Sequence, residues 1–200
     1  MAESSSNARL NHEDALRVGT YGVLGALMAG PPAKDLLERL ATAGGEEGSG
    51  GIGKAWSAVA LAAQRADPAE VRQEYSDVFI GVAQGEITPY ASWYLTGSLM
   101  ERPLVELRQS LKALGVERHR GVKEPEDHAG AVLETMALLI NADDVSFDRE
   151  QAFFQAHLEP WLKDCFTDVQ EAASAAFYRP VGLLGAEFMD LETKYYRMPV

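Results

Sequence analysis

The chain has 200 residues, of which 46% are hydrophobic and 24% are charged, and these proportions are typical of a soluble globular protein with one domain or at most two small ones. Its formal net charge is -12 at pH 7, which argues against nucleic acid as a partner because phosphates need Lys and Arg to neutralise them. The single cysteine, Cys165, excludes an internal disulfide and a metal site built from several cysteines. Cys165 lies in an apolar-patterned segment, so we expect a buried, inert thiol.

The sequence indicates neither a membrane segment nor an export signal. No uninterrupted apolar run reaches the roughly 18 to 20 residues that are needed to span a bilayer. Residues 1–7 lack a basic region followed by an apolar one. We therefore predict a cytoplasmic protein without stable membrane insertion, and we expect residues 1–10 to form a flexible polar tail.

Helical periodicity, with matching start and stop signals, runs through most of the remaining chain. Asn11 and Asp67 are predicted N-caps, and Pro68 suits the first position of the helix that follows Asp67. Ser92 is a candidate cap for a short helix. The predicted helices cover residues 11–30, 33–43, 55–65, 68–81, a short segment after 92, 104–114, 125–140 and 147–158, with one or two more between 162 and 196.

Residues 44–53 are rich in glycine and predict a flexible loop. The stretch from Gly48 to Lys54 resembles a phosphate-binding loop, in which backbone N–H groups hold phosphates and a lysine reaches them. The next residue is Ala55, so the hydroxyl that would bind magnesium is missing, and a helical pattern precedes the loop where the motif requires a strand. The sequence therefore favours a linker at this position.

The predicted fold class is all-α. No stretch shows the sustained alternation of apolar and polar residues that indicates a sheet, and no repeat of fixed period marks a helical solenoid. We predict a compact single-domain helical bundle of roughly eight to ten helices, most of them short, over residues 11–200.

A dense polar cluster, Glu124-Pro125-Glu126-Asp127-His128, precedes an apolar helical segment. Pro125 suits the first turn of a helix, and the carboxylates of Glu126 and Asp127 would then lie at the positive end of the helix dipole. The spacing of the apolar residues that follow predicts a buried helical face made of Val132, Met136, Leu139 and Ile140. The cluster could cap this helix, form a metal or acid–base site, or form a binding edge.

The residues give little support to catalysis. Neither a His-Glu-x-x-His motif nor a pair of histidines four residues apart on one predicted helix is present. We therefore predict no catalytic residues, no metal site and no cofactor. If the protein is an enzyme, the alternative function is that of a metal- or nucleotide-dependent hydrolase that uses Asp127, His128 and Glu134.

Peptide recognition is the other function that the residues suggest. Tyr90, Trp93 and Tyr94 lie beside Pro89, and together with the acidic cluster they could form an apolar surface rimmed by negative charge. Such a surface suits an extended or helical peptide with a basic end and an apolar stretch.

The motifs, taken in order, resemble those of the TorD/DmsD/NarJ-type redox-enzyme maturation chaperones. The resemblance extends from about residue 70 to 190 and combines a Glu-Pro-x-Asp-His motif with a His-Leu-x-Pro-Trp motif. The matching segments are Tyr75 to Gly81, Pro89 to Tyr94, Glu124 to His128 with Glu134, Phe154 to Trp161, and Ala176 to Arg179.

This resemblance implies a cytoplasmic chaperone rather than an enzyme. Members of the family bind the twin-arginine signal peptide and the apo form of a molybdopterin oxidoreductase of the dimethyl sulfoxide reductase class, assist insertion of its cofactor, and delay its export until it is mature. The partners expected here are therefore the leader peptide and the catalytic subunit of such an enzyme. We expect the chaperone to be a monomer or a helix-swapped homodimer. The signal-peptide-binding residues that the motifs imply are Tyr90, Ser92, Trp93, Glu124, Pro125, Asp127 and His128.

Overall fold

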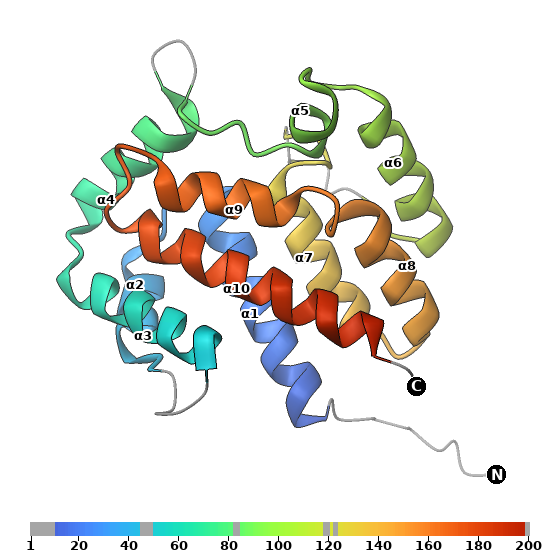
Figure 1. Cartoon of the computed structure of the whole chain (residues 1–200), viewed down its shortest axis with the longest axis horizontal. Coiled ribbons are helices and arrows are strands. Elements are labelled where there is room, and N and C mark those ends of the chain that lie inside the picture. The colour runs from blue at the N-terminus through green and yellow to red at the C-terminus, as the bar shows by residue number, and fades with distance from the viewer. Residues whose placement is uncertain (1–10, 45–49, 82–84, 118–120, 122–123, 199–200) are drawn as a thin grey trace.

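A computed structural model describes residues 11–44, 50–81, 85–117, 121 and 124–198 (Figure 1). Within these ranges the chain forms ten α-helices, one short π-helical stretch and no strand. The helices pack into one compact bundle, which confirms the predicted all-α fold class and its number of helices.

The first three helices follow the predicted pattern closely, with one exception. Helix α1 (His12–Ala29) begins as predicted, because the Asn11 side chain accepts a hydrogen bond from the Asp14 N–H. Helix α2 (Lys34–Thr42) follows, and α3 (Gly50–Arg65) begins at Gly50. Since residues 50–53 are helical, the prediction of a loop over 44–53 was wrong for its last four residues. Residues 45–49 and the predicted tail at 1–10 lie outside the described residues.

The middle of the chain forms shorter elements. Asp67 caps α4 (Pro68–Tyr75), which continues as the π-helical stretch η1 (Ser76–Ile80). Helix α5 (Ala91–Thr96) and helix α6 (Arg102–Leu114) come next, and each ends at a glycine in the left-handed conformation. Only glycine adopts that conformation without a steric cost, so these two helix ends agree with the sequence.

Helix α7 (Ala129–Ile140) begins later than predicted. Pro125 and Glu126 were expected in its first turn, but they lie in a turn outside the helix, in which the Pro125 carbonyl accepts from the His128 N–H. The predicted inner face is confirmed, because Val132, Met136, Leu139 and Ile140 are all buried. The chain ends with α8 (Phe147–His157), α9 (Leu162–Glu171) and α10 (Tyr178–Arg197).

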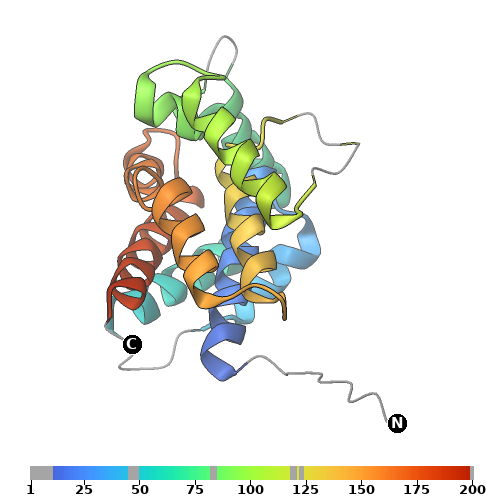
Figure 2. The ribbon, with the colours of Figure 1, turned by 90° about the vertical axis from the view of Figure 1, so that its right-hand side faces the viewer.

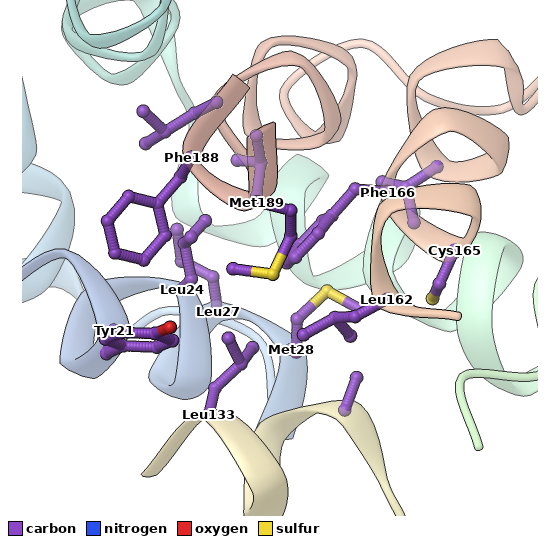
Figure 3. Packing of buried hydrophobic residues seen from close by; sticks show 14 of the residues in the cluster. Tyr21, Leu24, Leu27, Met28, Leu133, Leu162, Cys165, Phe166, Phe188 and Met189 are labelled. Atoms are coloured by element: carbon purple, nitrogen blue, oxygen red, sulfur yellow. The ribbon is translucent and has the colours of Figure 1, made fainter. Parts of the chain in front are cut away.

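Much of the core is formed by side chains of α1, α7, α9 and α10. Helix α1 packs along α7, and α10 packs along both α9 and α3. Figure 3 shows how side chains from α1, α7, α9 and α10 interdigitate, with Met28 of α1 and Met189 of α10 between aliphatic neighbours. Cys165 is buried in this core, and burial raises the pKa of its thiol to about 12, which confirms the expected buried position.

The start of α7 is fixed by a close approach to α1. A Cβ atom at Gly130 would lie 3.0 Å from the carbonyl oxygen of Gly25 and 3.0 Å from the Cβ atom of Ala29. Glycine at position 130 therefore lets the two helix backbones come together. This contact holds the first turn of α7, and the polar cluster before it, at a defined place on the bundle.

A buried ionic cluster joins α1, α8 and α10. The Arg17 guanidinium donates from Nε and Nη2 to both carboxylate oxygens of Glu192 at 2.8 Å, and from Nη2 to Glu150 at 2.8 Å. The hydroxyls of Tyr21 and Tyr196 complete the cluster, since Tyr21 donates to Glu192 and Tyr196 donates to Glu150. The carboxylates raise the pKa of Arg17, although burial alone would lower it, so the arginine stays charged.

None of the described helices is both long and apolar enough to cross a membrane.

Candidate functional site

The two segments singled out in the sequence lie against each other. Tyr90 and His128 form an isolated antiparallel bridge. The Ala91 N–H donates to the Asp127 carbonyl at 2.9 Å, and the Ala129 N–H donates to the Pro89 carbonyl at 2.8 Å. This bridge joins the start of α5 to the start of α7. Both views show α5 and α6 at one end of the bundle (Figures 1 and 2).

The Asp127 side chain caps α5, although Asp127 lies 35 residues after Ser92 in the sequence. Its Oδ2 atom accepts from the Ser92 N–H at 3.0 Å and from the Ser92 hydroxyl at 2.5 Å. The prediction that Ser92 itself caps this helix was wrong, because Ser92 lies inside α5 and donates to the cap. Asp127 is only 1% exposed, and its Oδ1 atom has no hydrogen-bond partner among the described residues.

His128 has a matching role at the start of α7. Its Nδ1 atom accepts from the Gly130 N–H at 3.1 Å, so the imidazole occupies the N-cap position. Burial lowers the pKa of His128, although the nearby carboxylates of Glu124 and Asp127 raise it. The ring packs edge-on against Tyr90, with 5.0 Å between the ring centroids. His128 is therefore a buried, neutral cap at neutral pH.

Glu124 and Tyr90 form the part of the bridge that faces solvent. The Tyr90 hydroxyl donates to Glu124 at 2.5 Å, and burial together with this contact raises the pKa of Tyr90. Glu124 is exposed and Pro125 is half-buried. The adjacent Glu126 pairs with Arg108 of α6 at 2.8 Å, which ties the turn to a third helix.

An exposed apolar patch begins beside the bridge. Trp93 points outward from α5 and is 39% exposed, and Met100, in the segment between α5 and α6, is 73% exposed. Leu95 and Leu99 are also exposed. We call these four residues the α5 patch. Sequence reasoning found only Trp93, because Leu95, Leu99 and Met100 lie where no helical period marks a face.

Tyr94 was predicted in the apolar surface together with Tyr90 and Trp93, but it packs against α9 and the segment before it and so holds α5 in place. Its ring packs on Trp161, with 5.5 Å between centroids, and its hydroxyl donates to Asp168 of α9 at 2.7 Å. Trp161 belongs to the His-Leu-x-Pro-Trp motif, and its indole N–H donates to the His157 carbonyl. The segment from Pro89 to Tyr94 and the His-Leu-x-Pro-Trp motif are therefore in contact with each other. At this contact Tyr94 faces inward, whereas Trp93 faces outward.

The structure does not assemble the alternative hydrolase site. Asp127 and His128 are buried and occupied as helix caps, whereas Glu134 is exposed on α7. Within the described residues, no group of three or more His, Cys, Asp or Glu side chains could hold a metal ion. Of the seven predicted peptide-binding residues, Tyr90, Trp93, Glu124 and Pro125 reach the surface, and Ser92, Asp127 and His128 lie beneath it.

Replacing Ser92 with alanine should lower the free energy of unfolding by about 1–3 kcal/mol, because the buried Asp127 carboxylate loses one of its two donors. Urea unfolding followed by circular dichroism measures this effect. Ser57→Ala is the matched control, since that hydroxyl only bonds to a carbonyl of its own helix at an exposed position. Equal stability of the two variants would show that the Ser92–Asp127 contact does not hold α5.

Comparison with known proteins places the chain among redox-enzyme maturation proteins. A chaperone protein TorD from Vibrio vulnificus (strain YJ016) is 29% identical over 137 residues, which cover 63% of this chain and 64% of the relative. A TorD from Vibrio atlanticus is 24% identical over the same length. The chain thus matches less than two thirds of the length of these relatives. Their names fit the prediction of a chaperone rather than an enzyme.

A solved structure and a family model extend the comparison. The crystal structure of a protein from Archaeoglobus fulgidus, assigned as a redox enzyme maturation protein, superposes with a TM-score of 0.61 over 94% of this chain and 99% of that one. Its 17% sequence identity supports a shared fold. The model of the nitrate reductase delta subunit family matches residues 46–167, which is more than half of the chain. The resemblance drawn from the motifs is thereby confirmed, and the chain belongs to the nitrate reductase delta subunit family, which includes the TorD-type proteins.

Proposed function

We propose that this protein is a cytoplasmic maturation chaperone for a molybdopterin oxidoreductase. In this proposal it binds the twin-arginine leader of the apo-enzyme, holds the enzyme for cofactor insertion and delays its export. The client would be a catalytic subunit of the dimethyl sulfoxide reductase class. Family membership and the names of the relatives support the maturation role, and the surface beside the Tyr90–His128 bridge supports leader binding.

The observation that carries leader binding is the adjacency of an apolar patch and an acidic edge. A twin-arginine leader is basic at its start and apolar after it. The α5 patch gathers four exposed apolar side chains in one short segment, and clustered exposed apolar side chains are typical of interaction sites. Glu124, which accepts from the Tyr90 hydroxyl, and Glu101, which follows Met100 in the sequence, are exposed carboxylates. Carboxylates at such positions can pair with guanidinium groups.

Asp127 would act in this proposal mainly as a positioning residue. Its side chain is buried and holds the first turn of α5 through Ser92. The orientation of Trp93 depends on that turn, because α5 has only six residues. The backbone bond from Ala91 to Asp127 and the bond from Tyr94 to Asp168 also hold this helix. The buried Oδ1 atom also leaves negative charge beneath the binding surface, where screening by salt is weaker than in solvent.

Replacing Trp93 with alanine should weaken binding of a twin-arginine leader peptide about 30-fold, because the loss of a large aromatic contact costs on the order of 2 kcal/mol. Glu124→Gln should weaken binding only a few-fold, since exposed ion pairs contribute about 0.2–1 kcal/mol. Isothermal titration calorimetry with a synthetic leader peptide measures both effects.

Two exposed residues away from this surface provide matched controls. Leu138→Ala removes an exposed apolar side chain from α7, and Glu38→Gln removes an exposed carboxylate from α2. Both variants should bind the peptide like the unmodified protein. Unchanged affinity in Trp93→Ala would place leader binding elsewhere on the protein.

A further inference from the structure

The connection between α5 and α6 holds one residue in an unfavourable backbone conformation. Met100 has a φ angle of 60°, and it is the only residue other than glycine with a positive φ among those that the structure describes. The Cβ atom of an L-residue crowds the following carbonyl oxygen in this left-handed region, so glycine usually occupies such positions. Gly97, in the same connection, has a φ of 77° and follows that rule. Met100 therefore adopts its conformation at a steric cost.

The Met100 side chain gains no burial in return for this cost. It is 73% exposed, which is the largest exposed fraction of any large hydrophobic residue in the described part of the chain. Folding stability alone would favour glycine for the backbone or a polar residue for the surface. Strained conformations that persist are concentrated at functional sites, where the surrounding structure holds them. Neither the strain nor the exposure of Met100 stabilises the fold.

A hydrogen-bond network holds the connection against the first turn of α5. The N–H of Glu101, the residue after Met100, donates to the Ser92 hydroxyl oxygen at 3.3 Å. That hydroxyl in turn donates to the buried Asp127 carboxylate. Before the connection, the Thr96 hydroxyl donates to the Ser92 carbonyl at 2.8 Å. Both ends of the connection are thus fixed to one residue, and this fixes the backbone that carries Met100.

The same network brings Met100 close to Trp93 along the surface. Trp93 follows Ser92 in the sequence and Met100 precedes Glu101, and Ser92 and Glu101 are in hydrogen-bond contact. Both apolar side chains are exposed. The indole ring is rigid, whereas the unbranched thioether side chain is flexible and polarisable and adapts to apolar partners of different shapes. The two residues therefore offer different kinds of apolar contact on one surface.

We propose that Met100 is a specificity-determining residue of the leader-binding surface, which contacts the apolar stretch of the leader and not its arginines. This inference rests on the proposed binding of a leader at the α5 patch. Ser92 and Asp127 act on it as positioning residues, because they hold the Glu101 N–H. A thioether contact selects apolar character rather than one exact side chain, so the surface accepts leaders whose apolar stretches differ in sequence.

Substitutions at position 100 test the contact by calorimetric titration with a synthetic twin-arginine leader peptide. Met100→Ala should weaken binding about tenfold, because it removes most of a methionine side chain that binding would bury. Met100→Leu conserves the volume and should keep the affinity within about twofold. Met198→Ala is the control and should leave binding unchanged, since Met198 is also exposed, at 57%, but follows α10. Figures 1 and 2 show the end of α10 away from α5.

Two altered peptides show which part of the leader Met100 contacts. Replacing the leucines of the apolar stretch with serines should reduce the effect of Met100→Ala from about tenfold to less than about twofold, because the partner of the contact is then missing. Replacing the twin arginines with glutamines should leave the effect at about tenfold. An effect that disappears with the arginines and persists with the serines would overturn the assignment.

The backbone strain has a test that needs no peptide. Met100→Gly and Met100→Ala both remove the side chain, but only glycine relieves the left-handed conformation. The Met100→Gly protein should therefore unfold at a higher urea concentration than the Met100→Ala protein, although both should bind the leader weakly. At Met198, where φ is -66°, glycine should give no such gain over alanine. An equal or lower unfolding midpoint for Met100→Gly than for Met100→Ala would overturn the proposal.

The titrations separate the role of Met100 from leader binding itself. If Trp93→Ala weakens binding and Met100→Ala does not, the role of Met100 is overturned and leader binding stands. If the leader peptide does not bind the unmodified protein, both are overturned. Circular dichroism should give the same helix content for the Met100 variants and the unmodified protein, so that a loss of affinity reports the contact.

Discussion

Replacing Arg17 with methionine is expected to lower the free energy of unfolding by about 3–5 kcal/mol, because the change leaves buried carboxylates without their counter-charge. Glu192 and Glu150 are both buried and both accept hydrogen bonds from the guanidinium. The loss would be a large part of the roughly 5–15 kcal/mol that stabilises a typical domain. Urea unfolding of the two proteins measures it.

The effect of Arg17→Met should also depend on pH. Burial raises the pKa of Glu192 above its ordinary value of 4.5, and Arg17 opposes this rise. Without Arg17 the pKa of Glu192 rises further, so the folded variant binds a proton more tightly than its unfolded chain does. That stabilising contribution is complete below about pH 4.5 and is lost as the pH rises through the folded pKa. The stability difference from the unmodified protein should therefore grow from pH 4 towards neutral pH.

Arg197→Met is the control, because it removes an arginine from the surface rather than from the buried cluster. Arg197 pairs with Glu159 at the surface, where an ion pair contributes about 0–1 kcal/mol. Comparable losses in the Arg17→Met and Arg197→Met proteins, or a loss at position 17 that does not change with pH, would contradict the account of the buried cluster.

Replacing Gly182 with alanine is expected to destabilise the protein by about 3 kcal/mol, at the upper end of the cost of overpacking a core. A Cβ atom at this position would lie 2.4 Å from the backbone nitrogen of Gln170 and 2.6 Å from the carbonyl oxygen of Phe166. Both atoms belong to the backbone of α9, so they cannot move aside as a flexible side chain could. Helix α10 would have to shift away from α9.

Gly22→Ala is the matched change on an open helix face. A Cβ atom there would have no described heavy atom within 4 Å, and alanine is favoured over glycine inside a helix by about 0.5–1 kcal/mol. This variant should therefore be slightly more stable than the unmodified protein, whereas Gly182→Ala should unfold at lower urea concentration. Equal effects of the two substitutions would show that α9 and α10 do not approach closely at Gly182.

Much of the fold could be predicted from the sequence because its signals are local. Asn11 and Asp67 cap the helices that they precede, and Gly97 and Gly115 end α5 and α6 in the left-handed conformation. The buried face of α7 follows from a spacing of three and four residues. The glycines at 50–53 gave a misleading signal, since α3 already includes them. Glycine lowers helix propensity, but tertiary packing can override that preference.

The site was predicted less completely because its contacts join residues far apart in the sequence. Asp127 and Ser92 are separated by 35 positions, so nothing in the local pattern shows that one caps the helix containing the other. The family motifs implied that Asp127 and His128 bind the signal peptide, but both side chains are buried beneath the surface. Leu99 and Met100 were not predicted as part of the binding surface for a different reason. Two apolar residues in a short connection show no helical or strand periodicity.

Calorimetric titration of the unmodified protein with two leader peptides tests the central claim most directly. One peptide has the twin arginines followed by an apolar stretch, and the other has glutamines in their place. The account predicts tighter binding of the arginine peptide, with a difference that shrinks as ionic strength rises because the acidic edge is screened. Equal affinities for the two peptides at every ionic strength would contradict the claim that this protein recognises a twin-arginine leader.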